Sequence, residues 1–313
     1  MGFVANPIQR ASVSDCSPFE CFDKESSSEK VIKLVLEVLA VIPFLVRMFK
    51  ATCTFISSHY IIGDLSSLKK INAGPSNYIT GPIEAKKVVF ETEGGQHIHG
   101  MHYTGGHNGK TILICSGSHQ SQVSFNQELF CDFRNQGYNI LAFDYEGFGE
   151  SEGSASETGI YRSTEAAYQY LMRNHVSKEN LICWGYSLGS SAAVYLGKKY
   201  GTNIVLDRGF SKISLVAYAR APNGLKSLAK FIFEQGVGFD NESELSKCKG
   251  KVRVVSAMDD TDMPKIHHFD RLKDKFKHLP NFRFIEVPGS HDHIYVGQTF
   301  WYEKEEFRNQ LDL

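Results

Sequence analysis

The chain has 313 residues, of which 42% are hydrophobic and 22% charged, so it can bury one large core and has the composition of a globular protein. Its 34 Lys and Arg side chains nearly balance 35 Asp and Glu, so no overall field favours nucleic acid or another polyanion as a partner. The seven cysteines are odd in number and lack metal-ligand spacing, which favours a reduced, intracellular protein.

The N-terminal part is predicted to be an extension of residues 1–80, ahead of a folded domain at 81–313. Its first thirty residues are polar and Ser-rich, unlike a secretory signal peptide. Residues 31–56 are apolar, but their longest uncharged run, Val38–Val46, is far shorter than the roughly 20 residues that cross a bilayer. An amphipathic helix is expected here, either packed on the main domain, which we favour, or lying in a membrane interface. We expect a cytoplasmic protein, with peripheral membrane contact and secretion into a host cell left open.

Short apolar runs alternate with helical stretches after a linker around Asn72–Pro82. The runs at 87–92 and 97–103 are predicted to pair antiparallel through a turn at Gly94 and Gly95. The later apolar runs are uninterrupted, which is typical of strands buried on both faces of a parallel sheet. The sequence therefore predicts an α/β fold with a mostly parallel sheet of about eight strands and helices on both faces. Further strands are expected at 111–115, 139–144, 181–185, 203–207, 252–257 and 282–287, and helices at 122–135, 159–174, 188–200 and after each of the last two strands.

Polar and titratable residues stand at the carboxyl ends of the predicted strands. In parallel α/β sheets these ends meet at one edge, where ligands bind. The sequence therefore predicts a reactive site at this edge, built from a serine, acids and a histidine. The strand ends are Ser116-Gly117-Ser118, Asp144-Tyr145, Ser187, Asp207, Asp259-Asp260 and Ser290-His291.

The nucleophile-elbow signature G-x-S-x-G occurs twice, as GESEG at 149–153 and as GYSLG at 185–189. An elbow needs a strand directly before it and a helix directly after it, and Ser187 meets both conditions. Ser151 lies seven residues beyond Asp144, precedes a loop, and is flanked by two glutamates that disfavour an oxyanion. Its hydroxyl is expected to cap backbone groups in a glycine-permitted turn. Ser187 is therefore the predicted nucleophile.

A serine hydroxyl needs a base, and a base of this kind needs an orienting acid. His291, in the loop after the last predicted strand, is preferred over the neighbouring His293. Asp260, in the loop AMDDTDMP, is the preferred acid. Asp207 at the end of NIVLD remains a rival, unless it forms an ion pair with Arg208.

An oxyanion hole needs two backbone donors. One is expected from Leu188, directly after the nucleophile, and the other from Ser118, with His119 as the alternative. The histidines of the strand at 97–103 lack an acidic companion with metal-ligand spacing, so we expect no metal, and no cofactor is implied.

These motifs together resemble the α/β-hydrolase family over roughly residues 85–300. FDYEGFGESEG is similar to its D-Y-x-G-x-G-x-S segment, GYSLG to its elbow and VPGSHD to its histidine loop. AMDDTDMP resembles its acid loop, with Ala257 in place of the usual glycine. FDNESELSKCKGKVRVVSAMDD and the apolar N-terminal segment resemble the capless branch with membrane-associated depalmitoylases, and LDRGFSKI resembles the chlamydial CHLPS group. The family's usual His-Gly after the third strand is replaced by Ser116-Gly117.

The resemblance and the residues lead to the same expectation: a serine hydrolase of the carboxylesterase, lipase or thioesterase type. The interval 208–250 is too short for a large cap, which suits an acyl group carried on a lipid or a protein. Two alternatives stay open, a non-catalytic hydrolase-fold binding protein and an amidase or peptidase that uses the same residues.

Overall fold

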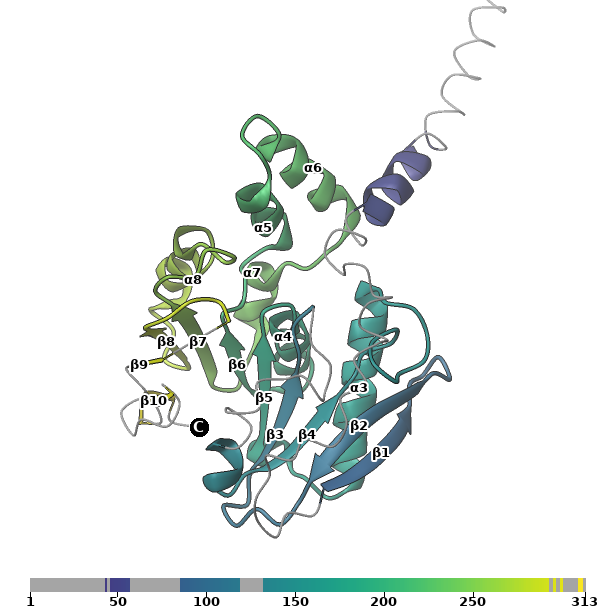
Figure 1. Cartoon of the computed structure of the whole chain (residues 1–313), viewed down its shortest axis with the longest axis vertical. Coiled ribbons are helices and arrows are strands. Elements are labelled where there is room, and N and C mark those ends of the chain that lie inside the picture. Colours follow the sequence, from purple (N-terminus) through teal and green to yellow (C-terminus); the bar gives the residue numbers. More distant parts are fainter. Residues whose placement is uncertain are drawn as a thin grey trace, which may run out of the picture. The chain divides into compact units, whose positions relative to one another are not determined.

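The computed structural model describes residues 43, 46–56, 85–118, 132–292, 295–296, 299–300 and 309–311 (Figure 1). The chain divides into a unit of residues 1–49 and a second unit of residues 50–313. The described part of the first unit is helical, and the helical run continues to residue 56. None of the described helices is both long enough and apolar enough to cross a membrane. The predicted boundary near residue 80 and most of the segment 31–56 lie outside the described residues.

The second unit is built on an eight-stranded sheet with the order β1-β2-β4-β3-β5-β6-β7-β8. The first two strands pair antiparallel with each other, β2 pairs antiparallel with β4, and all later neighbours are parallel. The predicted α/β architecture and the leading antiparallel pair are thereby confirmed. The strands are β1 (Ala85–Glu91), β2 (His97–Tyr103), β3 (Thr111–Cys115), β4 (Asn139–Phe143), β5 (Leu181–Tyr186), β6 (Asn203–Asp207), β7 (Val252–Ala257) and β8 (Phe282–Val287).

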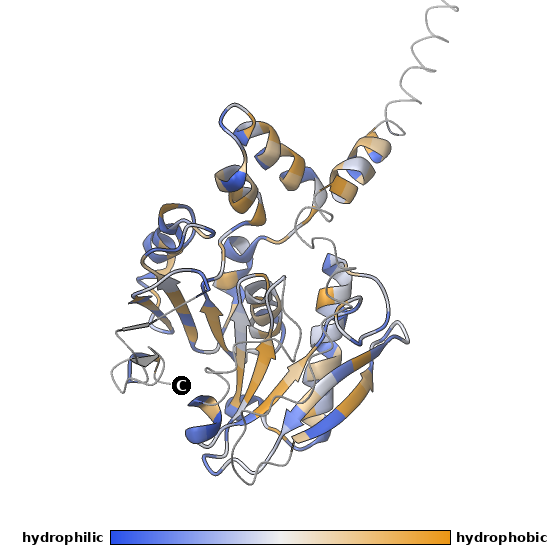
Figure 2. Cartoon of the chain, in the orientation of Figure 1, coloured by the Kyte–Doolittle hydropathy of each residue, from blue (hydrophilic) through white to orange (hydrophobic). Residues whose placement is uncertain are grey.

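The central strands are buried on both faces. Every residue of β3, β5 and β7 is buried, and the apolar character of β3 and β4 is visible in Figure 2. Successive side chains of a strand point to opposite faces, so Leu113 joins one core cluster while Ile112 and Ile114 join the other. This two-sided burial is why the strands read as continuous apolar runs.

Helices supply the covering layers on both faces of the sheet. The first cluster contains buried residues of α3 (Glu157–Arg173) and α4 (Gly189–Tyr200), which lie side by side in Figure 1. The second contains Phe133 and Leu311, from the short helical stretches 132–135 and 309–311. The remaining helices are α5 (Ile213–Arg220), α6 (Lys226–Gly236), α7 (Asn241–Glu244) and α8 (Phe269–Phe276), with single 3₁₀ turns at η2 (Lys178–Asn180), η3 (Leu245–Lys247) and η4 (Lys265–His267).

Several element bounds differ from the predictions by one or two residues, those of β1, β4, β5, α3 and α4 among them. Helix α3 begins two residues early because Ser156 caps it, accepting a hydrogen bond from the Gly159 N–H. The chain after β8 forms the strand pair β9 (Tyr295–Val296) and β10 (Thr299–Phe300), which was not predicted, ahead of the helical stretch 309–311. The predicted helix 122–135 is described only from residue 132.

Candidate active site

Ser187 stands in the turn that joins β5 directly to α4. Its φ of 49° lies in the left-handed region, and its N–H donates to the Asp207 carbonyl at 3.0 Å. The flanking glycines allow this turn because a Cβ on Gly185 would come within 2.3 Å of the Gly189 carbonyl oxygen. A Cβ on Gly189 would come within 2.0 Å of the Cys115 carbonyl oxygen. The two glycines are therefore required by close backbone approach.

His291 and Asp260 meet Ser187 from two other strand ends. The Nε2 atom of His291 lies 3.1 Å from Ser187 Oγ, and its Nδ1 atom lies 2.8 Å from Asp260 Oδ2. All three residues are buried. The second carboxylate oxygen, Asp260 Oδ1, accepts the Met263 N–H at 2.7 Å, which fixes the carboxylate in its loop. The structure thus brings the three predicted side chains into one hydrogen-bonded series, in which an Nδ1–H donated to Asp260 leaves Nε2 to accept from the serine hydroxyl.

Asp207, the rival acid, is engaged elsewhere. Its Oδ1 accepts from Arg208 Nε at 2.9 Å, and its Oδ2 accepts from Arg208 Nη2 at 3.0 Å and from Trp184 Nε1 at 3.1 Å. The alternative interpretation, an ion pair with Arg208, is confirmed. Asp260 is the carboxylate bonded to the His291 ring.

Leu188 and Ser118 border the same small cavity as Ser187. In the part of the chain that the structure describes, neither of their main-chain N–H groups donates to another group. The alternative donor, His119, lies outside the described residues, as does His293. The cavity, of about 40 Å³, is lined by Ser118, Ser187, Leu188, Phe210, Ile213, Val216, Ala217, Arg220, Phe233 and Met263.

Half of the lining residues of this cavity lie on α5 and α6, two helices that the sequence did not predict to be part of the site. Ile213, Val216 and Ala217 lie on α5 and Phe233 lies on α6. The interval 208–250 is too short for a separate cap, yet it holds the helices α5, α6 and α7. Because α5 packs on α6 beyond the carboxyl ends of the strands, this interval forms part of the cavity wall (Figure 1).

Ser151 belongs to a turn outside the cavity, as predicted. Its hydroxyl donates to the Asp144 carbonyl at 2.8 Å and accepts the His99 N–H at 3.0 Å. The flanking Glu150 and Glu152 lie beside histidines of β2, at 3.5 Å from His99 Nδ1 and 2.9 Å from His97 Nδ1. Through these contacts the segment GESEG connects the turn after β4 to the strand β2.

The third histidine of β2, His102, contacts Tyr170 with its Nδ1 atom at 3.1 Å. Burial lowers its pKa. Among the described residues, no group of three His, Cys, Asp or Glu side chains is placed to hold a metal ion.

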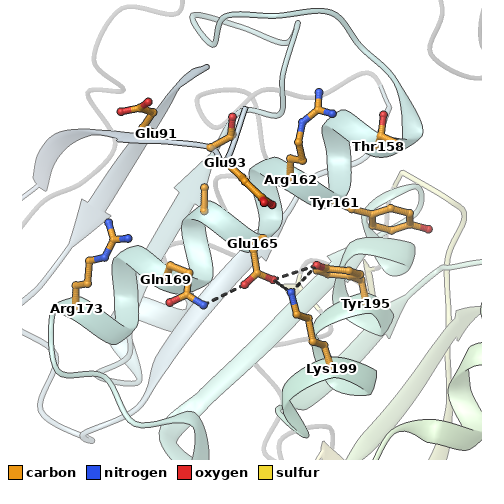
Figure 3. Close-up of a pocket in the computed structure, with 12 residues that line it drawn as sticks. Glu91, Glu93, Thr158, Tyr161, Arg162, Glu165, Gln169, Arg173, Tyr195 and Lys199 are labelled. Atoms are coloured by element: carbon orange, nitrogen blue, oxygen red, sulfur yellow. Dashed lines mark hydrogen bonds and ion pairs between the residues drawn. The ribbon is translucent and has the colours of Figure 1, made fainter. Parts of the chain in front are cut away.

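A larger cavity, of about 640 Å³, lies apart from these residues, between the end of β1 and helices α3 and α4 (Figure 3). Glu165 lies at its centre and accepts hydrogen bonds from Gln169, Tyr195 and Lys199 at 3.0–3.1 Å. Arg162 on its wall is paired with the buried Glu146. The charges of Glu165, Lys199 and Arg162 are thus paired within the protein, and the size of this cavity alone is no argument for placing chemistry there.

Comparisons with known proteins agree with this architecture. A family profile described as "Serine aminopeptidase, S33" matches residues 106–230. The uncharacterised protein YfhR of Salmonella typhi is 31% identical over 47% of this chain and 58% of its own length. The lysophosphatidylserine lipase ABHD12 of Danio rerio is 27% identical over 44% of this chain and 39% of its own length. The chain spans about half the length of the curated relatives it matches.

A solved α/β-hydrolase from Vibrio vulnificus superposes with a TM-score of 0.63 at 20% identity, covering 76% of this chain and 87% of that one. The two proteins therefore share the same fold. The eight-stranded sheet has the α/β-hydrolase fold, and the family profile and the related sequences support a place for the chain in the α/β-hydrolase superfamily.

Proposed function

We propose that this hydrolase cleaves carboxylic ester or thioester bonds of acyl substrates, carried on a lipid or a protein, through an acyl-enzyme at Ser187. The observation that carries the proposal is the series of hydrogen bonds from Ser187 Oγ to His291 Nε2 and from His291 Nδ1 to Asp260. Serine, imidazole and carboxylate in this order are the groups that acyl transfer by a serine requires. The reaction uses no cofactor and no metal.

In the first half-reaction Ser187 Oγ attacks the acyl carbon while His291 Nε2 takes the hydroxyl proton. The charge on the carbonyl oxygen is held by the N–H groups of Leu188 and Ser118. Such donors contribute roughly 3–4 kcal/mol each in comparable enzymes. The intermediate then expels the alcohol or thiol, which takes the proton from His291, and the acyl group stays on Ser187.

In the second half-reaction water attacks the acyl-enzyme and gives its proton to His291. The Ser187 oxygen leaves with that proton, and the carboxylic acid is released. Asp260 accepts the Nδ1–H throughout, so the imidazole keeps the tautomer that exposes Nε2 and the imidazolium is stabilised when it forms.

The lining of the cavity supports an acyl substrate over a free amino terminus. Its side chains are mainly apolar, and its one charged lining residue is a cation, Arg220. An aminopeptidase needs an acceptor for a substrate ammonium group, and no carboxylate is among the lining residues of the described part. Asp262, beside the cavity, is paired with Arg220 at 3.2 Å. The relative named as a lysophosphatidylserine lipase is consistent with an ester substrate.

A fluorophosphonate probe tests the proposal, since it reacts only with an activated serine. We expect labelling of the wild type and of Ser151→Ala, and none of Ser187→Ala. Parallel turnover of an ester, a thioester and an amide with one acyl group then separates esterase from amidase or peptidase. A folded wild type that is neither labelled nor active would contradict the proposal and favour the non-catalytic binding protein.

The N-terminal helical segment is proposed to contact a membrane surface peripherally. In its described part, residues 46–56, several large apolar side chains are exposed, among them Val46, Phe49 and Phe55. Such side chains favour the boundary between lipid headgroups and acyl chains. Flotation with lipid vesicles, comparing the full chain with a chain lacking residues 1–70, tests this: both versions staying off the vesicles would refute it.

A further inference from the structure

Asp207, the last residue of β6, and Arg208, the residue after it, are hydrogen-bonded to the main chains of Ser187 and His291, the two partners of the proposed proton transfer. The Asp207 carbonyl accepts the Ser187 N–H at 3.0 Å. The Arg208 Nη1 atom donates to the main-chain carbonyl of His291 at 2.6 Å. One short segment of the sheet therefore contacts the backbone of the nucleophile and the backbone of the base.

The Arg208 guanidinium has little freedom to move. Two of its nitrogens bind the two oxygens of Asp207, a bidentate arrangement that fixes the plane of the group. Asp207 is itself held by Trp184 Nε1, and Arg208 is only 3% exposed. The third nitrogen, Nη1, therefore points to the His291 carbonyl from a rigid support.

Tyr186 is a second donor to the same carbonyl. Its hydroxyl donates to the His291 carbonyl oxygen at 3.0 Å, and the Arg208 guanidinium carbon lies 4.6 Å from the centre of its ring. Burial raises the pKa of Tyr186, so the phenol keeps its proton and remains a donor. The position of the His291 backbone is thus set from the strands β5 and β6, independently of what the imidazole binds.

The backbone at Arg208 is strained, since its φ is 48°. Residues other than glycine rarely adopt the left-handed region, because the side chain then crowds the backbone. Here the strain is offset by the hydrogen bonds of the side chain, which only an arginine can make to both a carboxylate and a carbonyl in this geometry. The strained backbone and the buried ion pair therefore both hold the guanidinium where it contacts the His291 carbonyl.

We infer that Arg208, anchored by Asp207, is a positioning residue that keeps His291 Nε2 within hydrogen-bond distance of Ser187 Oγ. The inference rests on the proposed function. His291 lies in a loop after β8, with Gly289 at a φ of 112°, so the imidazole needs support beyond its own loop. Because a displacement of about 1 Å can cost roughly 100-fold in rate, one carbonyl contact is enough to matter.

The test compares Arg208→Gly with a matched control, Arg253→Met. Glycine accepts the φ of residue 208 without strain and removes the guanidinium. Arg253 is similarly buried, at 2% exposure, and also donates to main-chain carbonyls, those of Val252 and Asn281, but near the start of β7. Turnover of a soluble short-chain nitrophenyl ester is measured per folded molecule, with kcat and KM separated.

We expect Arg208→Gly to lower kcat by roughly 10- to 100-fold with KM changed by less than about 2-fold, and Arg253→Met to leave kcat within about 2-fold. Added guanidinium ion at low millimolar concentration, below denaturing levels, should partly restore Arg208→Gly alone. Arg208→Lys, which keeps the charge but not the fork, should remain impaired. Equal kcat losses in the two arginine variants, or unchanged kcat in Arg208→Gly, would overturn the inference.

A readout that needs no turnover separates this inference from the proposed function. The proton on His291 Nδ1 gives a downfield resonance when it is hydrogen-bonded to Asp260, and it is assigned by its loss in His291→Ala. We expect the resonance to shift or disappear in folded Arg208→Gly and to persist in Arg253→Met. If the wild type hydrolyses nothing, the proposed function fails, while an unchanged resonance in Arg208→Gly would refute the positioning role itself.

Discussion

Oδ2 of Asp260 lies 2.8 Å from Nδ1 of His291, so the carboxylate beside the imidazole follows β7 and not β6. The other strand-end aspartate, Asp207, is bonded through both carboxylate oxygens to Arg208. Two residues of the same type at the same edge of the sheet therefore have different electrostatic partners, and their substitution should have different consequences.

Asp260→Asn should lower kcat by roughly 10³- to 10⁴-fold with the fold retained, because an amide no longer selects the Nδ1–H tautomer of His291. Asp207→Asn should instead leave Arg208 buried without its counter-charge, at a cost of about 3–5 kcal/mol in the free energy of unfolding. Its kcat loss per folded molecule should be smaller, because it reaches His291 only through Arg208. Steady-state kinetics and urea unfolding on both variants check this. A stable Asp207→Asn protein as inactive as Asp260→Asn would contradict it.

Ser151→Ala should destabilise the protein without affecting the labelling of Ser187. The hydroxyl makes two hydrogen bonds, a buried one to the Asp144 carbonyl and a partly buried one from the His99 N–H, and the substitution removes both. The expected cost is about 1–3 kcal/mol in the free energy of unfolding. Urea unfolding measures the loss. A fluorophosphonate labelling rate below that of the wild type in the folded variant would argue against a purely structural role.

Gly185→Ala should prevent the elbow from forming. The added Cβ would come within 2.3 Å of the Gly189 carbonyl oxygen, which is backbone and cannot move aside without separating β5 from α4. We expect a loss of more than about 3 kcal/mol, or no folded protein. Gly224→Ala is the control, because its φ is 92° but no atom lies within 4 Å of its Cβ position, so it should cost only about 1 kcal/mol. Similar unfolding midpoints for the two variants would show that the close contact between β5 and α4 does not determine the stability of the protein.

Val216→Ala should widen the cavity beside Ser187 and shift the preference toward longer acyl groups. Val216 is buried on α5 and lines the cavity, whose volume is about 40 Å³. In favourable cases, a pocket that gains room for one more methylene of the substrate changes the ratio of kcat/KM between the longer and the shorter substrate by roughly 10-fold or more. A series of nitrophenyl esters from acetate to octanoate measures the shift. An unchanged chain-length profile would show that the acyl group lies elsewhere.

His268 should make the protein less stable below about pH 6.5. It is 1% exposed, its Nδ1 faces Ser211, and burial, together with the neighbouring His267, Arg220 and Arg271, lowers its pKa to about 3. Between these pH values the unfolded chain binds a proton that the native state does not, so the free energy of unfolding falls as the pH drops. The loss should reach about 2 kcal/mol at pH 5 relative to pH 7.

The non-titrating variant His268→Asn isolates this effect. It should lose about 2 kcal/mol less than the wild type over the same pH interval, as measured by urea unfolding at pH 7 and pH 5. Parallel losses in both proteins would show that other groups govern the acid sensitivity.

Local sequence patterns were sufficient to predict the structural features that depend on residues close together in the chain. The strand TILIC has the predicted bounds because a continuous apolar run is stable only when it is buried on both faces. GYSLG differs from GESEG because a strand enters it and a helix leaves it, and that difference is local. The strand pair β9 and β10 was not predicted, since two residues a strand are too few for any periodic signal.

The amino-acid sequence by itself determined the sheet, the place of the elbow and the edge at which Ser187, Asp260 and His291 gather. Only the tertiary structure decided between Asp260 and Asp207, placed the helix α5 on the wall of the cavity and brought Arg208 to the carbonyl of His291. The reason is physical. Strand burial and turn geometry follow from residues a few positions apart, whereas a hydrogen bond between residues 83 positions apart depends on how separate strands are packed side by side.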